Sequence, residues 1–168
     1  MIVFGIAGWS GSGKTTLIEK LIPAFGVLGR TVSVIKHAHH GFDLDRPGKD
    51  SFRHRDAGAT QVLMLSAQRW VLMHELRGAP EPDLPTQLSL LAPTDVVLIE
   101  GFKAAAVPKI EVWRAANAKA PLWSENPHVV AVATSDPLTT PLPVLPLDDG
   151  DAVAEFILAY HPGSVVSE

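Results

Sequence analysis

The sequence predicts an α/β protein in which helices cover both faces of a mostly parallel sheet. Short apolar segments typical of buried strands alternate along the chain with segments whose apolar residues recur at helical spacing. Such alternation is typical of parallel sheets covered by helices. A glycine-rich turn also joins the first strand directly to the first helix.

The first strand, helix and second strand follow from local patterns. Residues 2–7 are a short apolar run that ends in glycines, as in a buried parallel strand. A helix follows, with Gly29 as its expected C-terminal cap and Pro23 as a residue that kinks or shortens it. Residues 31–36 then form the second strand. The apolar residues at helical spacing are Leu17, Ile18, Leu21, Ile22 and Phe25.

A short helix and a hairpin come next. A polar loop leads into an expected helix over residues 51–57, with Asp50 or Ser51 as its N-cap. Residues 62–65 and 69–73 are two apolar runs joined by a short polar segment, which predicts an antiparallel hairpin.

The second half of the chain predicts further strands between two helices. A proline-rich loop leads into a helix over residues 86–91, and the last helix begins after Asp148. The expected strands there span residues 95–99, 109–114, 129–133 and 144–145.

Composition and charge limit the class of protein. The 168 residues are 46% hydrophobic and 19% charged, which predicts one globular domain over residues 1–161 and a frayed tail at 162–168. The absence of cysteine excludes disulfides and cysteine-ligated metals. With 18 acidic residues against 14 basic ones, we expect no nucleic-acid partner. No apolar run approaches the roughly 18 residues of a membrane span, and no basic leader opens the chain, so we expect a cytoplasmic protein.

Residues 8–15 predict a phosphate-binding loop. They read Gly-Trp-Ser-Gly-Ser-Gly-Lys-Thr and match the Walker A pattern G-x-x-x-x-G-K-[ST] between a strand and a helix. The glycines let successive backbone N–H groups point into one concavity, and the helix that starts at Gly13 adds its positive end. The pattern predicts a three-layer fold of the P-loop NTPase type. The residues expected to contact the nucleotide phosphates are Gly8, Ser10, Gly11, Ser12, Gly13, Lys14, Thr15 and Thr16.

The same motif predicts a magnesium site. Lys14 places a cation between the β- and γ-phosphates, and Thr15 offers its hydroxyl to Mg²⁺. Glu100, at the carboxyl end of a buried strand, either ligates the metal through water or polarises an attacking oxygen. Asp95 begins the same strand about 16 Å away and is expected to cap the strand entry instead. Lys14 and Glu100 are therefore the expected catalytic residues, and Thr15 and Glu100 the metal ligands.

The histidine-rich loop after the second strand leaves three interpretations open. In the first, Lys36 and His37 face the site and contact phosphate or substrate. In the second, His37, His39 and His40 form a zinc or nickel site. In the third, the segment is a solvated polar loop.

Three further positions are candidates for ligand contact. Either Arg53 or Arg55 holds a phosphate, or both lie on a helix surface and pair with neighbouring acidic residues. Lys103 is a further phosphate contact. Asp136 follows a buried strand, and its carboxylate can accept hydrogen bonds from N1–H and N2–H of guanine, although the lysine of an Asn/Thr-Lys-x-Asp motif is absent.

Four segments together resemble the molybdopterin-guanine dinucleotide biosynthesis protein B (MobB) family. The match runs over residues 1–66 and resumes around 94–114. The block Asp-Arg-Pro-Gly-Lys-Asp-Ser at 45–51, together with the histidine loop, is far more specific for this family than the phosphate loop, which very many families share. The segments are the phosphate loop, Val-Ile-Lys-His-Ala-His-His at 34–40, Phe-Asp-Leu-Asp-Arg-Pro-Gly-Lys-Asp-Ser-Phe-Arg-His-Arg-Asp-Ala-Gly-Ala at 42–59 and Leu-Ile-Glu-Gly-Phe-Lys at 98–103.

This resemblance implies GTP and Mg²⁺ as ligands, weak GTP hydrolysis at most, and an accessory role where GMP is attached to molybdopterin. It implies that a partner enzyme, the family's A protein (a molybdopterin guanylyltransferase), performs the nucleotidyl transfer, with molybdopterin as a further ligand. It also implies a homodimer and a P-loop sheet extended by a hairpin. Because the hairpin at 62–65 and 69–73 is apolar on both faces, we expect it at the dimer interface.

Other functions stay open at this point. An ATP-dependent small-molecule kinase would use Glu100 as the base for an acceptor hydroxyl, although residues 115–140 hold no clear arginine-rich lid. A metal-insertion GTPase would use His37, His39 and His40 to deliver nickel or zinc. A non-catalytic phosphate-binding module, in which nucleotide only orders loops for a partner, overlaps with the accessory role.

Overall fold

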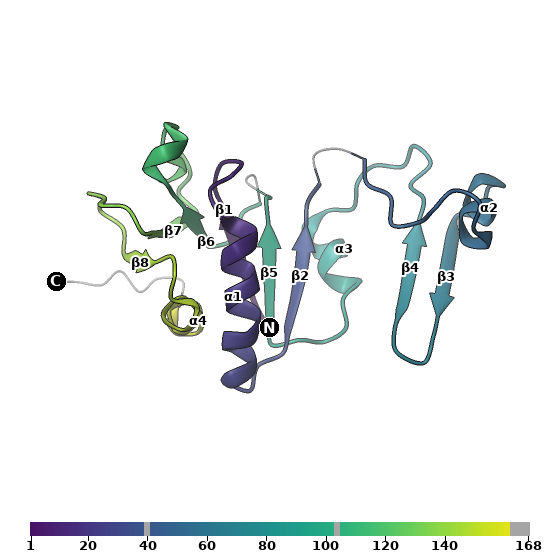
Figure 1. Cartoon of the computed structure of the whole chain (residues 1–168), viewed down its shortest axis with the longest axis horizontal. Helices are drawn as coiled ribbons and strands as arrows, with labels where there is room; N and C mark the ends of the chain where they lie inside the picture. Colours follow the sequence, from purple (N-terminus) through teal and green to yellow (C-terminus); the bar gives the residue numbers. More distant parts are fainter. Residues whose placement is uncertain (39–40, 103–104, 162–168) are drawn as a thin grey trace. The chain divides into compact units, whose positions relative to one another are not determined.

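The computed structural model describes residues 1–38, 41–102 and 105–161 (Figure 1). It divides the chain into two compact units, Met1–His37 with Leu91–Glu168, and Ala38–Leu90. The expectations of one domain over residues 1–161 and of a frayed tail at 162–168 stay predictions, and that tail lies outside the described residues.

The first unit holds a six-stranded parallel sheet in the order β2-β5-β1-β6-β7-β8. All five residues of β5 are buried, as expected of a strand covered on both faces. The predicted α/β fold with a mostly parallel sheet is confirmed. The strands are β1 (Ile2–Ala7), β2 (Val32–Lys36), β5 (Val96–Glu100), β6 (Lys109–Val112), β7 (Val129–Thr134) and β8 (Val144–Pro146).

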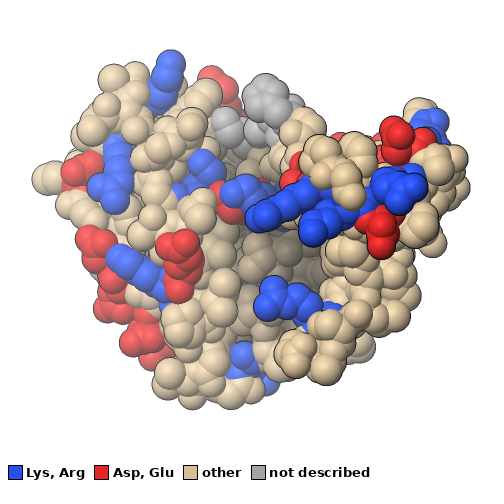
Figure 2. All heavy atoms as spheres, turned by 45° about the vertical axis from the view of Figure 1, so that its right-hand side comes forward, with Lys and Arg blue, Asp and Glu red and all other residues tan. Residues whose placement is uncertain are grey.

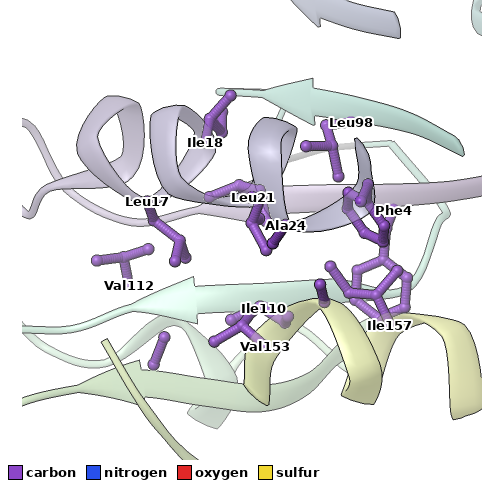
Figure 3. Close-up of a cluster of buried hydrophobic side chains, with 14 of the residues drawn as sticks. Phe4, Leu17, Ile18, Leu21, Ala24, Leu98, Ile110, Val112, Val153 and Ile157 are labelled. Carbon is purple, nitrogen blue, oxygen red and sulfur yellow. The ribbon is translucent and has the colours of Figure 1, made fainter. Parts of the chain in front are cut away.

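Helices α1 (Lys14–Val27) and α4 (Gly150–Ala159) bury their apolar side chains in one cluster on one face of this sheet. Figure 3 shows Ile110 of β6 beside Val153 of α4, with Leu21 of α1 in the same cluster. Each of these side chains is fully buried, and such burial contributes about 1.5–3 kcal/mol per side chain. The cluster therefore holds α1, and the loop that precedes it, firmly on the sheet.

The end of α1 differs in part from its prediction. The helix continues past Pro23 to Val27, so of the two effects considered for Pro23 the structure excludes an early end. Pro23 lacks an N–H group for the helix ladder, but the fully buried Phe25 keeps the last turn packed on the core. Gly29 terminates the helix as predicted, with φ of 68°, and Arg30 N–H donates to the Phe25 carbonyl at 2.9 Å.

The opposite face of β6 is covered by irregular segments. Lys109 and Glu111 alternate with Ile110 along the strand, so they point away from α1 and α4, and both are buried. The Glu111 carboxylate accepts backbone hydrogen bonds at 2.8–3.0 Å from the short 3₁₀ helix η2 (Leu122–Ser124). Lys109 donates to two carbonyls of the preceding loop, and burial lowers its pKa. A second 3₁₀ helix, η1 (Ala115–Asn117), also follows β6.

The second unit contains helices α2 (Asp50–Asp56) and α3 (Leu84–Ser89) and the antiparallel pair β3 (Gln61–Leu65) and β4 (Trp70–His74). The predicted hairpin is confirmed, and it forms a two-stranded sheet of its own. One face of it is solvent-exposed. That face carries Leu63, Leu65, Trp70 and Leu72, which are 52%, 71%, 64% and 43% exposed.

The starts of the two helices in this unit differ from expectation. α3 begins earlier than predicted, because the Asp83 carboxylate accepts a hydrogen bond from Thr86 N–H at 3.0 Å and caps it. α2 is capped by Lys49 rather than by either predicted residue. The hydroxyl of Ser51 instead donates to Asp45 Oδ1 at 2.9 Å.

The surface carries charged side chains of both signs, as the 14 basic and 18 acidic residues of the sequence lead one to expect. On the face in Figure 2, lysine and arginine side chains lie among aspartate and glutamate side chains. Within the described part of the chain, every helix is too short or too polar to cross a membrane.

Candidate functional site

The carboxyl ends of the parallel strands gather the candidate residues at one edge of the sheet, where ligands of such sheets bind. Residues 8–13 join β1 to α1 there (Figure 1). On one side of this loop, Glu100 ends β5 and Lys36 ends β2. On the other side, Arg114 follows β6 and Asp136 follows β7. The strand order alone therefore separates the candidates into two groups.

The loop takes backbone conformations that favour glycine. Gly8, Gly11 and Gly13 have φ values of 143°, 77° and 103°. A Cβ atom at Gly8 would lie 2.5 Å from the Val112 carbonyl oxygen, so a larger residue would collide with backbone. The two glycines that the motif requires, Gly8 and Gly13, and the additional Gly11 thus have a direct steric reason, and the loop backbone is shaped as a phosphate cradle requires.

The start of α1 is suited to an anion. Gly13 is its N-cap, no side chain caps it, and the first turn contains no acidic residue. No side chain of the first turn therefore neutralises the partial positive charge at the N-terminus of α1. The Lys14 ammonium donates to the Trp9 carbonyl at 2.8 Å and so lies along the same loop.

A carboxylate and a hydroxyl meet beside the loop. Thr15 Oγ1 donates to Glu100 Oε1 at 2.8 Å, although the two residues are 85 positions apart in the chain. Lys36 Nζ lies 3.5 Å from Glu100 Oε2. Glu100 is only 8% exposed, so these two contacts hold a nearly buried carboxylate in place. Hydroxyl and carboxylate oxygens are ligands that Mg²⁺ prefers, and this donor set fits an ion that also keeps waters and substrate phosphates.

The histidine loop is only partly described. His37 N–H donates to the Glu100 carbonyl at 3.1 Å, and its ring packs on Phe102 with centroids 4.9 Å apart. His37 therefore adjoins the strand that ends in Glu100. The candidates His39, His40 and Lys103 lie outside the described residues. Within the described residues, no cluster of three or more histidine and acidic side chains is arranged to hold a metal.

Asp136 connects the loop that follows β7 with the loop that follows β6, on the side of the phosphate loop opposite Glu100. Its Oδ2 accepts a hydrogen bond from Ala115 N–H at 2.8 Å, and its own N–H donates to Thr134 Oγ1 at 3.0 Å. These contacts orient the carboxylate at the carboxyl edge of the sheet.

Sequence reasoning missed Arg114. Its Nε donates to the Ser12 carbonyl at 2.9 Å, so it contacts the phosphate loop directly. The Trp9 side chain makes a second such link, from Nε1 to the Ala120 carbonyl at 2.8 Å. The position of Arg114 at the carboxyl end of a predicted strand was the signal that could have marked it.

The arginines of α2 make contacts within the second unit. Arg53 is 75% exposed on its side chain and lies 3.9 Å from Asp50 of the same helix. Arg55 has its side chain only 16% exposed and pairs with Glu75 at 2.8 Å and Asp43 at 3.0 Å. Hydrogen bonding to Glu75 raises the pKa of Arg55. The pKa of Asp43 is lowered chiefly by the hydrogen bond from Asp45 N–H and, to a lesser extent, by the hydrogen bond from Arg55. A phosphate contact by Arg53 stays a prediction.

A glycine-rich phosphate loop between the first strand and first helix of a parallel sheet, with an acidic residue ending the neighbouring strand, defines a protein of the P-loop class. Residues 3–135 match the model of a family described as molybdopterin guanine dinucleotide synthesis protein B, MobB. The chain belongs to the MobB family.

Individual relatives agree with this membership. The chain is 40% identical over 161 residues to the molybdopterin-guanine dinucleotide biosynthesis adapter protein of Escherichia coli K12, covering 94% of this chain and 92% of the relative. It is 43% identical over 155 residues to the protein of the same description from Haemophilus influenzae, covering 92% and 86%. The crystal structure of Bacillus subtilis MobB matches with a TM-score of 0.71 at 26% identity, covering 94% and 96%.

Proposed function

We propose that this chain is a cytoplasmic GTP-binding adapter in the synthesis of molybdopterin guanine dinucleotide, with weak GTP hydrolysis at most. Family membership and relatives described as adapter proteins support the role in this synthesis. A partner molybdopterin guanylyltransferase performs the nucleotidyl transfer. Molybdopterin is a further ligand of this chain.

The observation that carries the proposal is the contact of Thr15 with Glu100 at 2.8 Å beside the glycine loop. Thr15 and Glu100 would hold Mg²⁺, which would supply positive charge to neutralise the phosphates of a nucleotide. Lys14 adds a fixed cation to the same phosphates. Glu100 is also the group next to which an attacking water would be polarised, which accounts for the weak hydrolysis.

Strand order supports one orientation of the nucleotide. Since Thr15 and Glu100 mark the metal end on the β5 side of the loop, the nucleoside extends over the loops that follow β6 and β7. Asp136 lies on that side. A carboxylate oxygen accepts more than one hydrogen bond, so Asp136 can hold Ala115 N–H and still accept from guanine.

Nucleotide titration by calorimetry tests the proposal, with GTP and ATP each measured with and without Mg²⁺. We expect GTP to bind with Mg²⁺ dependence and ATP to bind at least about tenfold more weakly, because adenine cannot offer the two donors to Asp136. A preference for ATP would contradict the guanine assignment and favour a small-molecule kinase.

We further propose that the chain forms a homodimer through the exposed face of its hairpin. The register sets Leu63 opposite Leu72 and Leu65 opposite Trp70, so all four apolar side chains share one face. They line a groove of about 610 Å³ together with Gln61. Exposed apolar surface of this kind marks an interaction site.

Charges on this face are expected to separate the dimer. We predict that the chain carrying Leu63→Glu and Trp70→Glu sediments as a folded monomer where the unaltered chain is a dimer, because burying two carboxylates in an apolar interface is unfavourable. Leu44→Glu with Leu90→Glu is the matched control, since both leucines are exposed in the same unit but lie outside the hairpin. A folded double variant that stays dimeric, or an unaltered chain that is monomeric, would contradict the proposal.

A further inference from the structure

One arginine from the segment after β6 contacts the backbone of the phosphate loop. Arg114 Nε donates to the Ser12 carbonyl oxygen at 2.9 Å across 102 positions of chain. Its Nε and Nη2 atoms lie 3.6 Å from the position that a Cβ atom at Gly13 would occupy. The guanidinium is therefore next to the Ser12–Gly13 peptide, immediately before the start of α1.

This contact determines which way that peptide faces. In a trans peptide the C=O and N–H groups point in opposite directions, and the described chain contains no cis peptide. Because the Ser12 carbonyl is turned toward Arg114, the Gly13 N–H is turned away from Arg114. Gly13 also has φ of 103°, so its backbone reverses here without a Cβ penalty.

The charge of Arg114 is felt by groups around it. The pKa of Asp148 is lowered chiefly by its hydrogen bonds with Lys20 and Ser135, and the charge of Arg114 adds to this effect. Arg114 forms no close ion pair with a carboxylate among the described residues. The guanidinium is therefore not drawn away from the Ser12 carbonyl by a close carboxylate.

We propose that Arg114 is a positioning residue of the phosphate site, which by holding the Ser12 carbonyl turns the Gly13 N–H toward a bound pyrophosphate group. This inference rests on the proposed function, because it requires the loop to bind a nucleotide. It concerns the pyrophosphate moiety and not the base, so it applies equally to GTP and to inorganic pyrophosphate.

Calorimetric titration with magnesium pyrophosphate and with GTP tests this role. We expect Arg114→Met to weaken both ligands by the same factor, about 10-fold or more, because a charge-assisted contact and a peptide orientation are lost together. Arg114→Lys keeps the charge and a donor, and we expect it to recover most of the affinity. That recovery separates a positioning role from general damage to the fold.

Arg30→Met is the matched control. Arg30 lies in the same unit and pairs with Asp95 at 3.8 Å, where the strands begin rather than end. The substitution Arg30→Met removes the same charge as Arg114→Met. We expect the pyrophosphate affinity of this control to stay within about twofold of that of the unaltered chain, since solvent and salt screen a distant exposed charge.

The outcomes separate the inference from the proposed function. If the unaltered chain binds neither ligand, both fail. If it binds both and Arg114→Met binds them equally well, only the positioning role is overturned. It is also overturned if Arg114→Met weakens GTP alone, because that result indicates contact with the base. Should the methionine variant not fold, the amide NMR signal of Gly13 in the unaltered chain decides: pyrophosphate must shift it, and an unmoved signal overturns the role.

Discussion

Replacing Lys14 by alanine is expected to abolish measurable GTP binding, with affinity at least about 100-fold weaker. The change removes the ammonium that lies along the phosphate loop, where charge-assisted hydrogen bonds to phosphate are strong. Its ammonium also donates to the Trp9 carbonyl of the same loop, a local contact whose loss should leave the protein folded. Calorimetry with Mg²⁺–GTP measures the effect.

Lys20→Ala is the control for this prediction. Lys20 lies on the same helix, and its ammonium pairs with Asp148 at 2.8 Å instead of facing the loop. We expect GTP affinity within about twofold of that of the unaltered chain, because the charge lost there is partly exposed and paired. Affinity retained by Lys14→Ala would place the nucleotide elsewhere on the molecule.

Replacing Glu100 by glutamine is expected to uncouple GTP binding from Mg²⁺. The amide oxygen still accepts from the Thr15 hydroxyl, so the local geometry is kept, but the neutral group no longer attracts the cation. We expect GTP to bind without Mg²⁺ about as it does to the unaltered chain, while the gain from added Mg²⁺ falls about tenfold or more. Hydrolysis should fall with it. Paired titrations with and without Mg²⁺ measure this difference.

Glu19→Gln removes one carboxylate from the exposed surface of α1 and provides the comparison. Its Mg²⁺ titration should match that of the unaltered chain. If Glu100→Gln shows the same unaltered titration and unaltered hydrolysis, then Glu100 serves only to hold Thr15 and Lys36 in place.

The strand–loop–helix unit at the N-terminus could be predicted because its signals are local. Apolar residues in β1, glycines at positive φ and the helical spacing of Leu17, Leu21 and Phe25 each act within a few residues. Whether Pro23 ends the helix early could not be decided from local signals. The packing of α1 on the sheet outweighs the one hydrogen bond that proline removes.

The contacts of the arginines could not be predicted from short segments of the sequence. Arg53 and Arg55 were both candidates for phosphate contact, yet Arg55 is engaged by Glu75 and Asp43, which come from other segments. Arg114 was not a candidate at all, although it touches the phosphate loop. The position of Arg114 at the end of a predicted strand placed it at the ligand edge of the sheet, but the contacts of Arg55 and Arg114 themselves are made with residues remote in the chain.

The sequence by itself determined the class of fold, the phosphate loop and the place of Glu100 at the end of a buried strand. These depend on backbone conformation and on hydrophobic periodicity, which are properties of short segments. Only the tertiary structure decided which groups meet: the Thr15 and Glu100 side chains across 85 positions, and the Arg114 side chain with the Ser12 backbone carbonyl across 102. The physical reason is that strand order is set by packing of the whole sheet, and it places β5 on one side of β1 and β6 on the other. That arrangement separates Glu100 and Lys36 from Arg114 and Asp136.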